Sequence, residues 1–99
     1  METRLAQAEI LDYIRQSKER WRQQYGVVKV ALFGSYARDE HLATSDIDIL
    51  IEMDPTTFDG YMDLKFELED HFKRSVDLVT KQAIKERMFP FIEPDLLYA

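Results

Sequence analysis

Apolar side chains recur at steps of three and four residues through the first quarter of the chain, which is the period of an amphipathic helix. We expect a helix from residue 3 to about residue 25, with Trp21 as a core anchor. Gly26 follows and is expected to end it, because glycine is common directly after a helix. The positions assigned to the apolar face are Leu5, Ala8, Ile10, Leu11, Ile14, Lys18, Trp21 and Tyr25.

The pattern then becomes that of strands. Val27–Phe33 is apolar except at Lys29 and predicts a first strand, which Gly34-Ser35 ends. Residues 36–39 predict a helical turn and residues 40–44 a loop. A second strand is expected over residues 45–52, where every second side chain points to the same face. Isoleucines 47, 49 and 51 then share one face, and aspartates 46 and 48 share the other.

The next third of the chain predicts one more helix and one more strand. Residues 54–57 combine proline with short polar residues and predict a connector. A helix is expected over residues 59–73. A short strand should follow over residues 75–79, with Asp77 on the face opposite to its apolar neighbours. The helix carries its apolar residues at Tyr61, Leu64, Leu68 and Phe72.

The C-terminal residues carry a weaker pattern. Thr80 can cap a short helix through Arg87, and Pro90 and Pro94 are expected to break any continuation. Residues 96–98 form either a terminal strand or an apolar tail. The order helix–strand–strand–helix–strand predicts an α+β fold, a small mixed sheet with helices packed against it. We expect one domain over residues 1–99.

Composition narrows the class of protein. The chain is 45% hydrophobic and 32% charged, which is too apolar for intrinsic disorder. It has no cysteine, which excludes disulfides, Fe–S clusters and thiolate zinc sites. A net charge of −6 without a basic cluster argues against direct nucleic-acid binding. No apolar run has the length of a membrane span and the N-terminus does not resemble a signal peptide, so we expect a cytoplasmic protein.

Three aspartates make the candidate chemistry. Asp46 and Asp48 are like charges on one strand face, and each would raise the pKa of the other unless a cation neutralised both. Asp77 lies within another apolar strand and can face the same place. Carboxylate oxygens suit Mg²⁺, which completes its coordination with water and substrate phosphates. Three carboxylates can hold two Mg²⁺ ions for an in-line displacement at phosphorus.

Gly34-Ser35 is the candidate phosphate-binding turn. A strand that ends in glycine and turns into a short helix presents backbone N–H groups to an anion. Glycine permits close approach of the backbone, and the Ser35 hydroxyl adds a donor. Gly-Ser is also a common turn, so the pair indicates a nucleotide site only together with the nearby aspartates.

The stretch GSYARDEHLATSDIDILIE resembles the signature of the minimal nucleotidyltransferases of the DNA polymerase β-like superfamily. That signature is Gly-Ser, ten residues, Asp-x-Asp, and a third carboxylate on a later strand. Gly34-Ser35 and Asp46-Ile47-Asp48 match it without a gap, and Asp77 stands where the third carboxylate is expected. The resemblance implies the nucleotidyltransferase fold, with a sheet like the polymerase β palm.

A bare domain of 99 residues is most similar to the MntA-type antitoxins of HEPN–MNT toxin–antitoxin modules. This resemblance implies an Mg²⁺-dependent adenylyltransferase that moves AMP from ATP to a tyrosine of a HEPN ribonuclease toxin. It implies that Asp46, Asp48 and Asp77 bind the metals and that Asp77 also serves as general base. Gly34 and Ser35 would hold the triphosphate. An acidic surface also suits a basic partner.

Near the turn, Asp39 departs from the family pattern, and Arg38 and Tyr36 have two interpretations each. The family often has glycine where this chain has Asp39, and aspartate tolerates the left-handed conformation that such a turn needs. Arg38 is expected to bind the phosphates if the turn is helical; the alternative is an ion pair with Asp39, Glu40 or another surface acid. Tyr36 either contacts the nucleotide or packs in the core.

Two other functions fit the same residues. One is an antitoxin that only binds and occludes its toxin, with the metal site as a relic or nucleotide sensor. The other is a small-molecule nucleotidyltransferase that works as a homodimer, with an interface from the N-terminal helix or from the tail through Tyr98.

Overall fold

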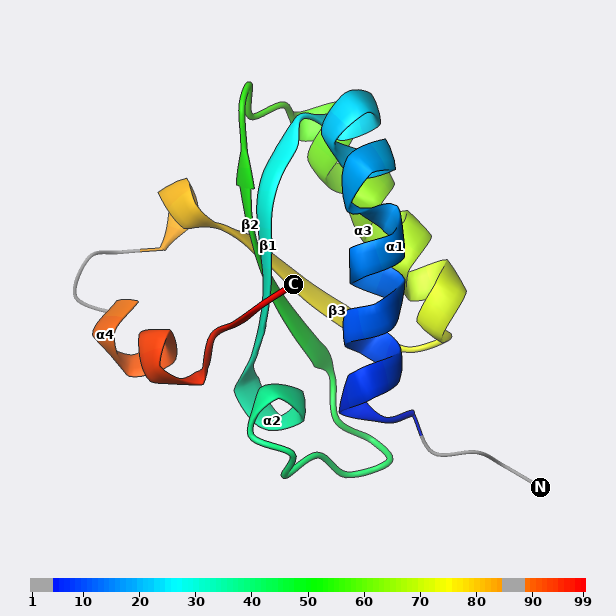
Figure 1. Ribbon diagram of the computed structural model, residues 1–99, viewed down its shortest axis with the longest axis vertical. Coiled ribbons are helices and arrows are strands. Elements are labelled where there is room, and N and C mark those ends of the chain that lie inside the picture. The colour runs from blue at the N-terminus through cyan, green and yellow to red at the C-terminus, as the bar shows by residue number, and fades with distance from the viewer. Residues whose placement is uncertain (1–4, 85–88) are drawn as a thin grey trace.

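The computed structural model describes residues 5–84 and 89–99 and contains a four-stranded mixed sheet with two long helices on one face (Figure 1). The strand order is β3-β2-β1-β4, with β1 antiparallel to both β2 and β4, and β2 parallel to β3. This confirms the predicted α+β class and the mixed sheet. The elements are α1 (Gln7–Tyr25), β1 (Val27–Phe33), α2 (Gly34–Ala37), β2 (Ile47–Met53), α3 (Phe58–Phe72), β3 (Val76–Thr80), η1 (Lys81–Ala83), α4 (Phe89–Ile92), η2 (Glu93–Asp95) and β4 (Leu97–Tyr98).

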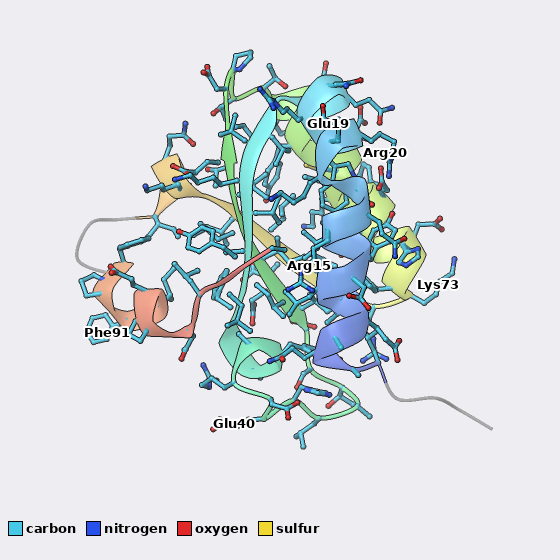
Figure 2. All side chains as sticks on the ribbon, in the orientation of Figure 1. Arg15, Glu19, Arg20, Glu40, Lys73 and Phe91 are labelled. Atoms are coloured by element: carbon cyan, nitrogen blue, oxygen red, sulfur yellow. The ribbon has the colours of Figure 1, made fainter. Side chains whose placement is uncertain are left out.

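The core lies between the sheet and helices α1 and α3, and side chains fill that space in Figure 2. Trp21 of α1 is fully buried, which confirms its prediction as a core anchor. Leu64 and Leu68 of α3 are also fully buried, as is Ile49 of β2. Each such side chain stabilises the fold by about 1.5–3 kcal/mol through removal of apolar surface from water. The shorter elements α4 and η2 lie on the other side of the sheet (Figure 1).

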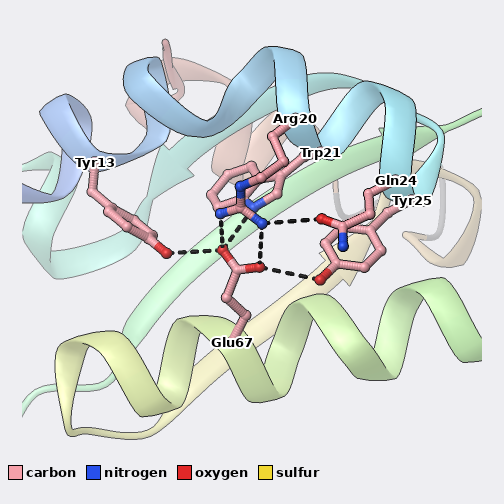
Figure 3. Close-up of polar contacts among 6 residues, drawn as sticks. All are labelled: Tyr13, Arg20, Trp21, Gln24, Tyr25 and Glu67. Carbon is pink, nitrogen blue, oxygen red and sulfur yellow. Dashed lines mark hydrogen bonds and ion pairs between the residues drawn. The ribbon is translucent and has the colours of Figure 1, made fainter.

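One carboxylate joins α1 to α3. Glu67 of α3 accepts hydrogen bonds from the Tyr13 hydroxyl at 2.8 Å, the Trp21 indole at 2.8 Å and the Tyr25 hydroxyl at 3.1 Å (Figure 3). Both terminal nitrogens of Arg20 also donate to it, at 2.8 and 2.7 Å. The Arg20 hydrogen bonds are the largest reason that the pKa of Glu67 falls from 4.5 to about 2, although burial acts in the opposite direction.

The start of α1 differs from the prediction. The helix begins at Gln7, residues 5 and 6 are not helical, and residues 3 and 4 lie outside the described part. Leu5 packs against the core from the segment before the helix, so the apolar pattern continues past the helix end. Ala8 and Lys18 are exposed, and Ser17 is buried in place of Lys18. Positions 17 and 18 both fit the helical spacing, and only tertiary packing shows which of them is buried.

The two strands that carry aspartates are also shifted from their predicted bounds. β2 begins at Ile47 rather than residue 45, so Asp46 lies in the loop directly before the strand. Ser45 is held in a turn, because its N–H donates to the Leu42 carbonyl at 3.0 Å and its hydroxyl accepts from the Leu42 N–H at 2.8 Å. β3 covers Val76–Thr80, one residue later than expected.

The predicted helix after Thr80 is wrong in its described part. Only the three-residue η1 follows β3, and the Thr80 hydroxyl makes no capping hydrogen bond to it. Without that cap, the first N–H groups of a longer helix would have no side-chain acceptor. The rest of the predicted helix, from residue 85 to Arg87, falls outside the described residues.

The two C-terminal prolines do not interrupt helical structure where they stand. Pro90 is the second residue of α4 and Pro94 the second of η2. A proline is tolerated there because the first N–H groups of a helix have no intrahelical partner. The segment after them forms β4, which pairs with β1 and confirms the strand alternative for residues 96–98. Among the described residues, no helix is both long enough and apolar enough to cross a membrane.

Candidate active site

The structure brings the three predicted aspartates to one end of the sheet. β2 and β3 run parallel in a register that pairs Asp48 with Asp77, so both side chains leave the sheet on the same face. Asp46 stands two positions before Asp48, and Asp46 and Asp77 are both near enough to raise the pKa of Asp48. Ile47 and Ile49 are buried on the opposite face, so the aspartates face away from α1 and α3.

Gly34 lies directly against Asp48. Phe33, the last residue of β1, pairs with Asp48 of β2, and the chain then turns at Gly34 with a φ of +74°. A Cβ atom at Gly34 would lie 2.1 Å from Asp48 Oδ2 and 2.9 Å from Asp48 Cγ. Glycine is therefore required twice, for the left-handed backbone and for the space that the carboxylate occupies. The predicted proximity of the Gly-Ser turn to the aspartates is confirmed.

The turn itself is a single helical turn, α2. The Arg38 N–H donates to the Gly34 carbonyl at 3.1 Å, and the Glu40 N–H donates to the Ser35 carbonyl at 2.9 Å. Asp39 has a φ of +58°, which confirms the expectation that it replaces a glycine in the left-handed conformation. Ser35 is partly exposed, and its hydroxyl forms no hydrogen bond within the described residues. That hydroxyl is available to donate to a ligand.

Arg38 forms ion pairs at the surface. Its Nε lies 3.2 Å from Glu40 Oε2, and its Nη1 lies 2.9 Å from Asp95 Oδ2 in η2. The alternative reading of Arg38 as an ion-pair residue therefore describes this structure. The guanidinium still acts on the site, because it lowers the pKa of Asp48. Tyr36 is fully buried, which supports packing rather than contact with a nucleotide.

Among the three aspartates, Asp48 is the one whose pKa is clearly raised. Burial is the largest cause that raises its pKa to about 6, and the charges of Asp77 and Asp46 raise it further. A carboxylate destabilised in its charged form by other carboxylates gains most from a bound cation. The oxygen-only donor set fits Mg²⁺, which is commonly held by one or two carboxylates and substrate phosphates.

The side chains of the three aspartates do not converge on a single point. Among the described residues, no group of three or more His, Cys, Asp or Glu side chains has the geometry to hold a metal ion. Asp46 and Asp77 are exposed, so their side chains can rotate toward Asp48 without a change of backbone. The residues present therefore fit an Mg²⁺ site that would be completed when nucleotide and metal bind together.

Two side chains that contact Tyr36 of the turn were not assigned a role from the sequence. Arg74, between α3 and β3, donates from Nη1 to the Tyr36 hydroxyl at 2.7 Å and to the Ala43 carbonyl at 3.1 Å. His41 stacks on the Tyr36 ring with centroids 4.1 Å apart and the planes at 13°. Neither residue lies on a periodic element, so no pattern in the sequence could have assigned it a partner.

Comparison with known proteins gives one family. A family model described as a nucleotidyltransferase domain matches residues 14–98. Protein MJ0128 of Methanocaldococcus jannaschii, named as a predicted protein adenylyltransferase, is 44% identical over 96 residues, covering 92% of this chain and 95% of that protein. Protein adenylyltransferase MntA of Thermococcus cleftensis is 30% identical over 92 residues, covering 91% of this chain and 92% of that protein.

Solved structures with the same fold were also found. A protein described as a predicted minimal nucleotidyltransferase superposes with a TM-score of 0.79 at 26% identity, covering 97% of this chain and 98% of that chain. A complex of a tri-AMPylated Shewanella oneidensis HEPN toxin with an MNT antitoxin contains a chain that matches with a TM-score of 0.59. That match is 18% identical, covers 93% of this chain and 66% of that chain, and shows the fold alone.

Proposed function

Because this chain belongs to the nucleotidyltransferase-domain family, we propose that it is an Mg²⁺-dependent protein adenylyltransferase that transfers AMP from ATP to a HEPN-type toxin and so acts as its antitoxin. The family and fold predicted from sequence are confirmed by the comparisons. The protein substrate is proposed from the names of the relatives.

The observation that carries the proposal is the contact between the Gly-Ser turn and the paired aspartates. Gly34 lies against the Asp48 carboxylate, and Asp48 is in register with Asp77 on the neighbouring strand. A triphosphate held by the Gly34 and Ser35 backbone N–H groups and by the Ser35 hydroxyl would therefore meet metal ions held by Asp46, Asp48 and Asp77. When bound, two Mg²⁺ ions neutralise the triphosphate and polarise the acceptor hydroxyl.

The reaction proposed is a single displacement at the α-phosphorus of ATP. The oxygen of a toxin tyrosine forms a bond to that phosphorus, the bond to the bridging oxygen breaks, and pyrophosphate leaves with the electron pair. Asp77 is exposed at the edge of the site and takes the proton of the tyrosine hydroxyl as general base. Burial and the neighbouring negative charges raise the pKa of Asp48, so its ionised form would be stabilised by a bound cation.

We propose that Arg38 releases one of its carboxylate partners and contacts the phosphates instead. Its side chain is 43% exposed, and the ion pairs with Glu40 and Asp95 lie at the surface. Surface pairs of this kind contribute at most about 1 kcal/mol, so a triphosphate can displace a carboxylate from Arg38 at little cost. Residues 1–99 would act as one domain in the cytoplasm, where ATP is available.

The proposal is tested by intact-mass spectrometry of both proteins after incubation with a HEPN-type toxin from the same genome, ATP and Mg²⁺. We expect the toxin to gain one or more AMP units, and tyrosine to carry them. Asp48→Asn should abolish the gain because it removes the charge that holds the metal, whereas the control Asp70→Asn, on the exposed face of α3, should not.

Two outcomes would contradict the proposal and identify the alternatives. A tight complex whose two masses never change would leave an antitoxin that acts by binding alone. Transfer of AMP to a small molecule in the absence of toxin would indicate a small-molecule nucleotidyltransferase.

A further inference from the structure

A single guanidinium connects the three segments that build the candidate site. Arg74 precedes β3, which carries Asp77, and its Nη1 donates to the Tyr36 hydroxyl in α2 at 2.7 Å. The same nitrogen donates to the carbonyl of Ala43 at 3.1 Å, in the loop that leads to Asp46. Nη1 carries two hydrogens, so both are used, one on each segment. We propose that Arg74 is a positioning residue that sets the Gly-Ser turn and the aspartate loop at the separation from β3 that nucleotide and metal require.

The ring of Tyr36 extends this connection. Tyr36 is fully buried and stacks on His41 with centroids 4.1 Å apart, so it presents its hydroxyl to Arg74 in a fixed direction. From the other side, Gln7 of α1 donates to the carbonyls of Tyr36 and Ala37 at 3.0 and 2.9 Å. The turn is therefore held at its backbone by α1 and at its side chain by Arg74.

The arrangement is a poor one for stability alone. Within the described residues, the buried side-chain polar atoms without a hydrogen-bond partner are Arg74 Nε and His41 Nδ1, and both residues contact Tyr36. A buried donor or acceptor of this kind has a desolvation cost that no hydrogen bond offsets. Departures of this kind are expected where a group serves the geometry of a functional site.

Arg74 acts through position rather than through its charge. Both of its hydrogen bonds go to uncharged oxygens, a tyrosine hydroxyl and a backbone carbonyl. Its two hydrogen bonds span 38 and 31 residues of sequence, so they fix segments that nothing local would hold together. Misplacement of reacting groups by about 1 Å costs on the order of 100-fold in rate.

The inference rests on the proposed function, and its test separates the two. Titration calorimetry with Mg²⁺ and AMP-PNP measures assembly of the site without any transfer reaction. We expect Arg74→Met to weaken binding about 10- to 100-fold and Tyr36→Phe, which keeps the ring but removes the acceptor, to weaken it several-fold. Arg74→Lys should recover part of the loss, because one ammonium reaches one acceptor but lacks the planar fork.

Arg15→Met is the matched control. Arg15 is an exposed arginine on α1, and within the described part of the chain its side chain pairs only with Asp12, at 3.5 Å and largely in solvent. Its loss should leave binding unchanged. Fluorescence of Trp21, the single tryptophan, checks that each variant is folded.

Amide hydrogen exchange gives a second readout that does not depend on nucleotide. In Arg74→Met without ligand, residues 34–37 and 40–46 should exchange faster, while the amides of β1 and β2 remain protected. Unchanged exchange in both segments, or binding of AMP-PNP equal to that of the wild type, would overturn the positioning role. If the wild type binds no Mg²⁺ and AMP-PNP, the proposed function fails first and the role of Arg74 fails with it.

Discussion

Replacing Glu67 by glutamine should remove the largest polar contribution to the packing of α1 on α3 (Figure 3). The pKa of Glu67 falls from 4.5 to about 2. At about 1.4 kcal/mol per unit this corresponds to roughly 3 kcal/mol in favour of the charged form. Glu67 is 21% exposed and Arg20 is 48% exposed, so solvent screening reduces the ionic part to about 2 kcal/mol.

Glutamine has the same shape but adds a cost of its own. Tyr13, Trp21 and one Arg20 nitrogen donate to Oε2 of Glu67, and Tyr25 and the other Arg20 nitrogen donate to Oε1. An amide nitrogen at either position would face donors and leave them without an acceptor, at about 1–3 kcal/mol. We expect Glu67→Gln to lower the free energy of unfolding at pH 7 by about 2–4 kcal/mol, a large fraction of a small domain's stability.

Urea unfolding followed by Trp21 fluorescence and by far-UV circular dichroism measures this loss. The control is Asp70→Asn on the same helix, whose pair with Lys73 is 85% and 77% exposed. It should change the free energy of unfolding by less than about 1 kcal/mol. If Glu67→Gln unfolds within 0.5 kcal/mol of the wild type, roughly the effect of a neutral surface change, the network does not stabilise the fold as argued.

The difference in free energy of unfolding between the wild type and Glu67→Gln should depend on pH. The folded-state pKa of Glu67 lies below its unfolded value, so its contribution is complete above about pH 4.5 and is lost as pH falls toward about 2. The stability difference between wild type and Glu67→Gln should therefore shrink over that window. An equal difference at pH 7 and pH 2.5 would show that the ionised carboxylate is not the cause.

Three further substitutions test the site and the core. Gly34→Ala should abolish AMP transfer and destabilise the fold by about 1–3 kcal/mol, because a Cβ on this left-handed backbone would lie 2.1 Å from Asp48 Oδ2. A fully active variant would show that the turn is not needed. Asp95→Asn should lower the KM for ATP, because it frees Arg38 from its ion pair with Asp95. The free energy of unfolding should stay within about 1 kcal/mol of the wild type. A raised KM would assign Asp95 to the nucleotide site. Leu64→Ala should cost about 2–5 kcal/mol in urea unfolding, and a loss below 1 kcal/mol would place Leu64 outside the packed core.

The parts of the site that could be predicted from sequence are those that depend on local geometry. Strand alternation placed Asp48 opposite the buried isoleucines, and pairing of the two consecutive strands β1 and β2 placed Gly34 beside it. The order of elements indicated a mixed sheet but not which strands pair, and the parallel pairing of β2 with β3 puts Asp48 in register with Asp77. These features need no knowledge of side-chain packing.

The features that could not be predicted depend on contacts between distant segments. Glu67 lies on a helix rich in acids, and nothing in the sequence separates it from its solvated neighbours until α1 packs against α3. Arg74 follows the end of a helix, where a basic residue is ordinarily a favourable neighbour of the helix dipole. The pairing of Arg38 with Asp95 depends on the course of the C-terminal segment across the sheet, for which periodicity gives no signal.

The proposed function requires that the Gly34 turn, Asp46 and the aspartates of β2 and β3 form one metal–nucleotide site. Anomalous diffraction from crystals grown with Mn²⁺ and AMP-PNP locates the metal directly. We expect a peak at about 2.0–2.2 Å from carboxylate oxygens of Asp46 and Asp48, with the triphosphate against the turn. A peak elsewhere, or nucleotide bound away from Gly34 and Asp48, would contradict it.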